Sequence, residues 1–340
     1  MLAIEALQGI RVLDLTRLLP GPLATQWMVQ MGAEVIKIEE PGQGDPMRHM
    51  RPEGLFELVN RGKKSVVLNL KLASDQQRFH QLAASADLVV EGFRPGVMDR
   101  LNCGWQALHR QNPQLIYVAV TGYGSQGAFR DLAGHDVNYL AMAGVLDLIG
   151  EPEGPPTIPG IQIADIAGGS MQALIGALAA LLKRRQTGCG QYVEINMMRG
   201  AASFLAVARA QLEGGAVPRR GQEVLSGRYA CYHIYATADQ RYIAVGALEA
   251  KFWRNLCEAL GRPEYAAHQF AEDPQRSEII SVFQAIFRQR SAAEWWDMLK
   301  ERDVCVTPVR TVAEAMADIS FDFPGKVPAL GEHTEEYLSR

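Results

Sequence analysis

The chain has 340 residues, of which 48% are hydrophobic and 21% charged, and its formal net charge at pH 7 is −4. This composition is typical of a globular protein with about two domains, and it gives no indication of nucleic-acid binding. No signal-peptide pattern is present, and the longest apolar run, residues 173–182, is too short to cross a membrane, so we expect a cytoplasmic protein without a membrane partner. The five cysteines have no paired spacing, which predicts neither disulfides nor a metal site.

The first 125 residues alternate strand-like and helix-like segments. Strands are predicted at residues 10–15, 34–39, 65–70, 87–91 and 115–120, and helices at 23–31, 74–86, 97–101 and 105–111. Because helices separate successive strands, we expect a parallel sheet in a doubly wound α/β domain. Ligands bind at the carboxyl ends of such strands.

The first strand-to-helix turn resembles half of a dinucleotide-binding unit but departs from its pattern. Pro20 and Pro22 stand where that unit has glycines that let a pyrophosphate approach the backbone. A nicotinamide site of the usual kind is therefore not expected.

Beyond residue 125, the sequence predicts further helices and a strand, and then a second, smaller α/β unit. Helices are expected at residues 137–148, 168–185 and 197–212, a strand at 191–196 and a polar connector at 213–227. The second unit begins near Tyr229, with an antiparallel pair at 229–235 and 242–245, helices at 251–260, 276–288 and 292–300, and a short helix at 312–318 before a polar tail.

His135 and Asp165 are the candidate catalytic residues. His135 titrates near neutral pH, and Asp136 and Asn138 beside it are candidates to fix its tautomer. Asp165 is expected just before a helix that begins at Gly168, where a capping carboxylate is the alternative interpretation. The small residues Gly168 and Gly169 would let a thioester approach N–H groups that hold a developing enolate. A helix dipole lowers the pKa of a nearby carboxyl group, so a proton-donor role for Asp165 requires desolvation.

Two basic loops are candidates for anion binding. Residues 60–64 precede one predicted strand, and residues 93–96 follow another, with Arg100 on the next helix. They suit the phosphates of a nucleotide such as coenzyme A, although solvated charged surface is an equally good interpretation. Tyr123 is a candidate for an acyl channel. Glu249 follows a strand of the second unit, and a lone acid there is more often structural.

Five motifs in order give the chain a family resemblance. They lie at residues 11–15, 20–22, 32–39, 60–65 and 91–96, and together they resemble the family III CoA-transferases, a superfamily that includes carnitine CoA-transferase, formyl-CoA transferase and α-methylacyl-CoA racemase. The resemblance runs from about residue 8 to 312, and the tail at 328–334 also fits. The segment at 320–327 is shorter than in the family by some tens of residues.

The resemblance implies an interlocked homodimer with coenzyme A on the large domain. It implies a Rossmann-like large domain at residues 1–200, completed by 313–340, a linker at 201–227 and a small domain at 228–312. No metal is implied, and no cofactor beyond coenzyme A as part of the substrate.

Within the superfamily, the motif at residues 134–139 is similar to that of racemases. By that similarity, His135 removes the α-proton of a 2-methylacyl or 2-arylacyl thioester and Asp165 returns one to the opposite face, while Asp136 and Glu249 orient and tune His135. The implied coenzyme A contacts are Leu68, Asn69, Leu70, Lys71, Gly92, Phe93, Arg94 and Arg100, with Gly134, Asn138 and Tyr139 from the motif.

The resemblance leaves two enzymatic reactions open. A CoA-transferase would use Asp165 as a nucleophile, forming anhydride and thioester intermediates. Glu40, where racemases have an arginine, favours this transferase branch, whereas His135 favours the racemase. A non-catalytic coenzyme A-binding protein is the third possibility, and the retained pair of His135 and Asp165 argues against it.

Overall fold

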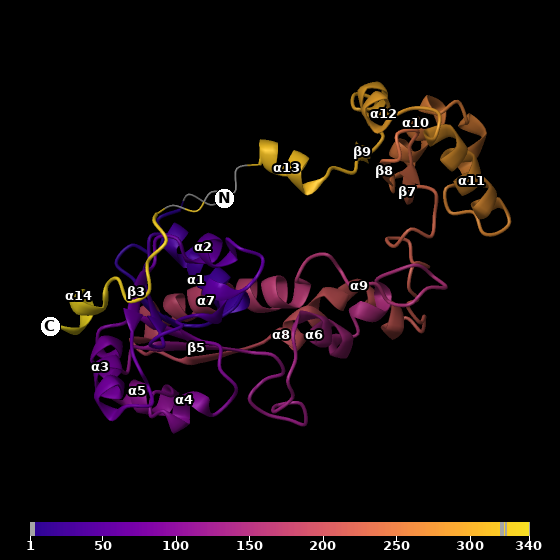
Figure 1. Cartoon of the computed structure of the whole chain (residues 1–340). Coiled ribbons are helices and arrows are strands. Elements are labelled where there is room, and N and C mark those ends of the chain that lie inside the picture. The colour runs from indigo at the N-terminus through magenta and orange to yellow at the C-terminus, as the bar shows by residue number, and fades with distance from the viewer. Residues whose placement is uncertain (1–3, 320–322, 324, 340) are drawn as a thin grey trace. The chain divides into compact units, whose positions relative to one another are not determined.

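The computed structural model describes residues 4–319, 323 and 325–339, which form two compact units. The larger unit contains residues 4–146 and 158–207 and the described residues from 323 to 339. The smaller unit contains residues 147–157 and 208–319. Figure 1 shows the course of the chain through both, and each is described by itself.

The larger unit is built on a six-stranded, fully parallel sheet, as the sequence predicts. The strand order is β3-β2-β1-β4-β5-β6, with Leu13 of β1 in register with Ile36 of β2 and Val89 of β4. The chain fills one half of the sheet before it crosses to the other, so the connections reverse direction between β1 and β4. Ligands of doubly wound sheets bind at this reversal. The strands are β1 (Arg11–Leu15), β2 (Glu34–Glu39), β3 (Lys64–Val67), β4 (Leu88–Glu91), β5 (Ile116–Thr121) and β6 (Tyr192–Asn196).

Helices connect these strands near the predicted positions. Pro20 and Pro22 lie in the first turn of α1, where the missing N–H and the fixed φ of proline suit a helix start. The short helix α2 is an addition to the predicted elements. The helices of the larger unit are α1 (Pro20–Gln30), α2 (Leu55–Asn60), α3 (Ala73–Ala84), α4 (Val97–Arg100), α5 (Trp105–Gln111), α6 (Asp136–Ala143), α7 (Gln172–Thr187) and α8 (Met197–Ala202), and α9 (Ala206–Glu213) runs into the smaller unit.

The helix that ends in α7 begins earlier than the sequence predicts. A π-helical turn, η3 (Ala164–Met171), continues directly into α7, so the predicted start at Gly168 is wrong. By length and composition alone, the combined helix, Ala164–Thr187, is long and apolar enough to span a membrane. The uninterrupted apolar run at residues 173–182 is only part of it. The core helix of a folded domain has the same properties, and one face of α7, formed by Ala173, Ala177 and Ala180, is buried. Met171, Ile175 and Leu182 are exposed.

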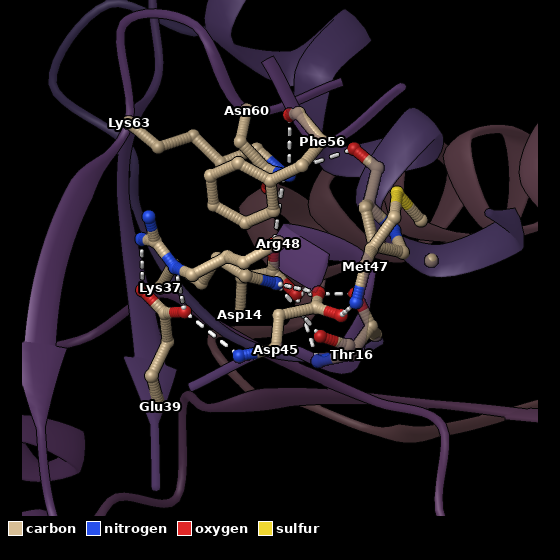
Figure 2. Close-up of polar contacts among 12 residues, drawn as sticks. Asp14, Thr16, Lys37, Glu39, Asp45, Met47, Arg48, Phe56, Asn60 and Lys63 are labelled. Carbon is tan, nitrogen blue, oxygen red and sulfur yellow. Dashed lines mark hydrogen bonds and ion pairs between the residues drawn. The ribbon is translucent and has the colours of Figure 1, made fainter. Parts of the chain in front are cut away.

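Buried ion pairs tie together the carboxyl ends of β1 and β2 and the start of β3. Lys63 Nζ lies 3.0 Å from Asp14 Oδ2, and both side chains are 0% exposed. Lys63 also contacts the Asn60 side chain, so the expectation that residues 60–64 bind an external anion is wrong for Lys63. Lys37 Nζ lies 2.8 Å from Asp45 Oδ2 in a second buried pair (Figure 2).

Asp14 is the acceptor around which this cluster is organised. Burial alone would raise the pKa of Asp14, but Lys63, Lys37 and hydrogen bonds from Thr16 and Thr25 together hold it well below its usual range. Asp14 is therefore ionised at neutral pH, and Lys63 provides the nearest compensating charge.

A second set of contacts joins this region to the C-terminal segment. The Glu39 carboxylate accepts hydrogen bonds from Arg48 (Figure 2). It also accepts one from the Ser65 hydroxyl. On β3, the Ser65 carbonyl accepts from His333 N, and Val67 N donates to Thr334 Oγ1 at the start of α14 (Thr334–Leu338). Figure 1 shows α14 beside β3. The segment covers an edge strand that would otherwise expose unpaired backbone groups. Of residues 320–327, the segment that the resemblance suggests is shortened, residues 320–322 and 324 lie outside the described residues.

The smaller unit contains a three-stranded antiparallel sheet in the order β7-β8-β9. The third strand, β9, is an addition to the predicted pair. Aromatic side chains fill the core, with Tyr235 stacked on Phe287 at a centroid distance of 5.0 Å and Trp253 at 5.3 Å from Phe283. The elements are β7 (Tyr232–Ala236), β8 (Tyr242–Gly246), β9 (Val306–Pro308), α10 (Ala250–Ala259), α11 (Gln275–Phe287), α12 (Ala292–Leu299) and α13 (Val312–Asp318).

Replacing Lys63 tests the buried pair. We expect Lys63→Met to lower the free energy of unfolding by about 3–5 kcal/mol, because Asp14 is left as a buried charge without its nearest cation. Chemical denaturation of the purified protein measures this change.

The neighbouring Lys64 is half-buried and provides a matched control. Lys64→Met should change stability by about 0.5 kcal/mol or less. Adding Asp14→Asn to Lys63→Met should restore part of the lost stability. Equal stability of Lys63→Met and the wild type would show that the pair does not hold the strand ends.

Candidate active site

Loops at the sheet reversal enclose a cavity of about 390 Å³ in the larger unit. The loops after β1, β4 and β5 contribute to its wall, together with the segment that precedes α6. His135 and Asp165 both line this first cavity, so the fold brings the two predicted catalytic residues to one site.

His135 occupies the N-cap position of α6 with its side chain exposed. Its backbone N–H donates to Asn138 Oδ1 at 3.1 Å. Asn138 therefore holds the backbone of His135, whereas the sequence suggested that it fixes the imidazole. The His135 side chain and Asn138 form a capping-box arrangement at the start of α6.

Asp136 contacts the other catalytic candidate. Its Oδ1 accepts a hydrogen bond of 2.9 Å from the backbone N–H of Asp165, which joins α6 to the π-helical turn η3. Burial and the nearby charge of Asp136 raise the pKa of Asp165 to about 7. Desolvation thus outweighs the helix dipole, and the carboxyl group of Asp165 exists in both protonation states near neutral pH. This is the property that a proton donor at neutral pH requires.

Tyr139 and Tyr123 support the loop that carries His135. Tyr139 Oη donates to the carbonyl of Gly134 at 2.5 Å, and the two tyrosine rings meet edge to face at 5.1 Å. A Cβ atom on Gly134 would lie 2.7 Å from Tyr123 Oη, so this close approach requires glycine. Tyr123, Gly134 and Tyr139 line the first cavity. The acyl channel expected at Tyr123 stays a prediction.

Gly168 and Gly169 have a packing role that the sequence did not predict. Both are buried inside the continuous helix, so they do not form its N-terminus. A Cβ atom on Gly168 would lie 2.7 Å from the carbonyl oxygen of Met197, and one on Gly200 would lie 2.3 Å from the carbonyl oxygen of Gly168. The glycines allow η3 and α8 to touch along their backbones, and this contact positions the turn that carries Asp165.

The predicted coenzyme A residues divide between two cavities. Leu68, Asn69, Leu70 and Lys71 follow β3 and line a second cavity of about 330 Å³, whereas Gly92 and Arg94 line the first. Phe93 lines both cavities. Arg100 and Asn138 are in neither lining, although Arg100 lies beside the turn at Gly96.

Two cavity arginines were missed in the sequence. The guanidinium of Arg17 lies 4.7 Å from the centroid of the Phe93 ring, and Arg130 lines the first cavity near Arg94. The signal for Arg17 was its place in the turn after β1, at the carboxyl end of a central strand.

Glu249 belongs to the smaller unit, where it is the N-cap residue of α10 without a side-chain capping bond. Its influence on His135 remains a prediction. Among the described residues, no group of three or more His, Cys, Asp and Glu side chains has the arrangement of a metal site.

Comparisons with known proteins identify the family. Residues 7–337 match the sequence model of the family described as CoA-transferase family III. The chain belongs to this family. It is 35% identical to the alpha-methylacyl-CoA racemase of Homo sapiens over 98% of this chain and 92% of that protein. It is 34% identical to the acetyl-CoA:oxalate CoA-transferase of Acetobacter aceti over 90% of this chain and 81% of that protein.

Solved structures agree with this assignment. A CAIB/BAIF family protein from Brucella suis matches with a TM-score of 0.84 at 27% identity, over 97% of both chains. The chain is therefore an enzyme of the superfamily that contains family III CoA-transferases and racemases, and acyl-CoA is its class of substrate.

The pKa of Asp165 predicts how stability depends on pH. A carboxyl group whose pKa is 3.8 when unfolded and about 7 when folded stabilises the fold fully below pH 3.8, and this contribution is lost as the pH rises to about 7. Between pH 5 and 8, we expect the wild type to lose about 2–3 kcal/mol of stability relative to Asp165→Asn. Denaturant unfolding at a series of pH values measures this.

Asp131 is exposed in the same region and serves as the control. Asp131→Asn should keep the pH dependence of the wild type. Parallel curves for the wild type and Asp165→Asn would contradict the raised pKa.

The glycine contact predicts a position-specific effect of a single methyl group. Gly168→Ala should destabilise the protein by about 1–3 kcal/mol, because η3 and α8 must separate. A Cβ atom on Gly160 meets no other atom within 4 Å, so Gly160→Ala should have little effect. Thermal unfolding compares the two variants, and equal effects would contradict the assigned role of Gly168.

Proposed function

We propose that this protein racemises CoA thioesters of 2-methyl or 2-aryl carboxylic acids by removing and returning the α-proton. The observation that carries the proposal is the shared cavity of His135 and Asp165, in which Asp165 has a pKa of about 7. Two groups that exchange protons near neutral pH are what a reversible α-proton transfer needs.

In the proposed reaction, coenzyme A occupies the second cavity and the acyl group occupies the first. Leu68, Asn69, Leu70 and Lys71 would contact the nucleotide, and Arg94 and Arg100 its phosphates. His135 takes the α-proton and the electron pair of the C–H bond moves into an enolate. The protonated carboxyl group of Asp165 then gives its proton to the opposite face of the α-carbon. The roles reverse for the other enantiomer.

Electrostatics of the first cavity favour the enolate. Arg130 lines it, so negative charge that develops on the thioester oxygen meets a guanidinium. This group is charged before the reaction and requires no protonation step.

We also propose that the enzyme is a cytoplasmic interlocked homodimer with no cofactor beyond coenzyme A, as its family resemblance implies. The exposed apolar side chains Met171, Ile175 and Leu182 along η3 and α7 support a partner surface on this helix. In such an assembly, Glu249 would tune His135.

A CoA-transferase is the second candidate. Asp165 would attack the thioester as a carboxylate, and Glu40 near the second cavity supports this branch. The similarity to a CoA-transferase named for oxalate, and an arginine-lined cavity that suits an acceptor carboxylate, also favour it.

Isotope exchange tests the proposed racemase. Incubation with (2S)-2-methyldecanoyl-CoA in deuterium oxide should introduce one deuterium at the α-carbon and form the 2R thioester. His135→Ala should reduce exchange by about 10²–10⁴-fold, because one of the two proton-transfer groups is lost. NMR and mass spectrometry measure both outcomes.

The same samples distinguish the second candidate. Failure to exchange the α-proton across a panel of acyl lengths would contradict the racemase. Transfer of coenzyme A to an added acid, with an Asp165 acyl adduct trapped by hydroxylamine, would establish the transferase. In that case His135→Ala should retain most of the activity.

A further inference from the structure

The loop after β1 is held in one conformation by the buried charge cluster beneath it. Thr16 donates through its backbone N–H and its hydroxyl to Asp14 Oδ1, and its carbonyl oxygen accepts from Lys37 Nζ at 2.9 Å (Figure 2). Leu18 has φ = 64°, a conformation that leucine rarely adopts without such support. A Cβ atom on Gly21 would lie 2.2 Å from Thr16 Cβ, so the following helix presses against the same loop.

This fixed loop presents Arg17 to both cavities. Arg17 and Phe93 each line the first and the second cavity, and the guanidinium stacks on the Phe93 ring at 4.7 Å. Among the described residues, Arg17 has neither an ion-pair partner nor a hydrogen-bond acceptor. An exposed, stacked guanidinium on an ordered loop keeps its donors free for a ligand.

Other arginines are placed to bind the phosphates of coenzyme A (Arg94 and Arg100) or to face the thioester (Arg130). A Cβ atom on Gly96 would lie 3.5 Å from both Arg100 Nη1 and Arg130 Nη2, and Arg94 belongs to the same turn. Arg130 Nη1 lies 3.9 Å from the exposed carboxylate of Asp131. These arginines follow β4 and β5, whereas Arg17 follows β1 on the other side of the sheet reversal.

The positive charge that lines the first cavity is therefore greater than a thioester with a neutral acyl group would balance. Asp165 is only partly ionised at neutral pH because of its raised pKa, so it does not balance Arg17. A planar guanidinium matches the two oxygens of a carboxylate in a bidentate contact.

We propose that Arg17 is a specificity-determining residue that binds a second carboxylate on the acyl group. The preferred substrates are then CoA thioesters of 2-methyl-branched dicarboxylic acids. This inference rests on the proposed function and names the substrate class of the same site.

Two thioesters of matched shape test the proposal. The probes are 2-methylsuccinyl-CoA, thioesterified at the carboxyl group next to the methyl branch, and 2,4-dimethylpentanoyl-CoA, in which an isopropyl group replaces the free carboxylate. We expect the wild type to bind the carboxylated probe about 10- to 100-fold more tightly, as for a charge-assisted hydrogen bond in a partly desolvated site. Isothermal titration measures binding, and α-proton exchange in deuterium oxide measures turnover.

Substitutions at two arginines separate the acyl contact from contacts with coenzyme A. Arg17→Gln should abolish the preference by weakening only the carboxylated probe, and Arg17→Lys should retain part of it. Arg100→Gln should weaken both probes by the same factor. Arg17 is exposed, so Arg17→Gln should unfold at the same denaturant concentration as the wild type.

Equal affinity of the wild type for the two probes, or an equal loss for both in Arg17→Gln, would overturn the proposal, since Arg17 would then contact a part common to both. Failure of the proposed function gives a different result. In that case the carboxylated probe is still preferred and the preference still depends on Arg17, but no α-proton exchange occurs. If neither probe binds, both proposals are overturned.

Discussion

The buried charges of Asp14, Lys63, Lys37 and Asp45 are the constraint on which the rest of the larger unit depends. A buried ion without its partner is strongly destabilising, so the ends of β1 and β2 and the start of β3 have one arrangement in which all four charges are compensated. The loop after β1 is held by the same groups. Through Glu39 and Ser65, the network also reaches the C-terminal segment that covers the edge of β3. A part of the chain that is far away in sequence thus completes the support of the site.

The strand order places the functional residues on this support. Loops that leave β1, β4 and β5 meet at the point where the sheet connections reverse, and they form most of the first cavity. Asp165 comes from a helix packed against this arrangement through glycine-to-backbone contacts with α8. The hydrogen bond between Asp136 and the backbone of Asp165 connects the segments that carry His135 and Asp165, so displacement of either helix would move both groups.

The two candidate reactions differ in the form of Asp165 that each one uses. A racemase needs the protonated group as a donor in one direction and the carboxylate as a base in the other, whereas a transferase needs only the carboxylate nucleophile. A pKa of about 7 supplies both forms. Family membership is shared by the two chemistries, which makes His135 the residue that favours racemisation. The cationic lining of the cavity is compatible with an enolate and with a carboxylate.

The sequence by itself determined the parallel α/β sheet, most of its helices and strands, the family and the pairing of His135 with Asp165 as candidates. These features depend on local periodicity or on short motifs, so neighbouring residues are enough to indicate them. Only the tertiary structure decided that Lys63 is buried against Asp14, that Gly168 serves a helix contact inside a longer helix, and that Arg17 reaches the cavity. Each of these depends on a group from a distant part of the chain, whether a buried carboxylate, the backbone of α8 or the ring of Phe93. Desolvation is likewise a property of the folded surroundings, and it set the pKa of Asp165 against the direction expected from a helix terminus alone.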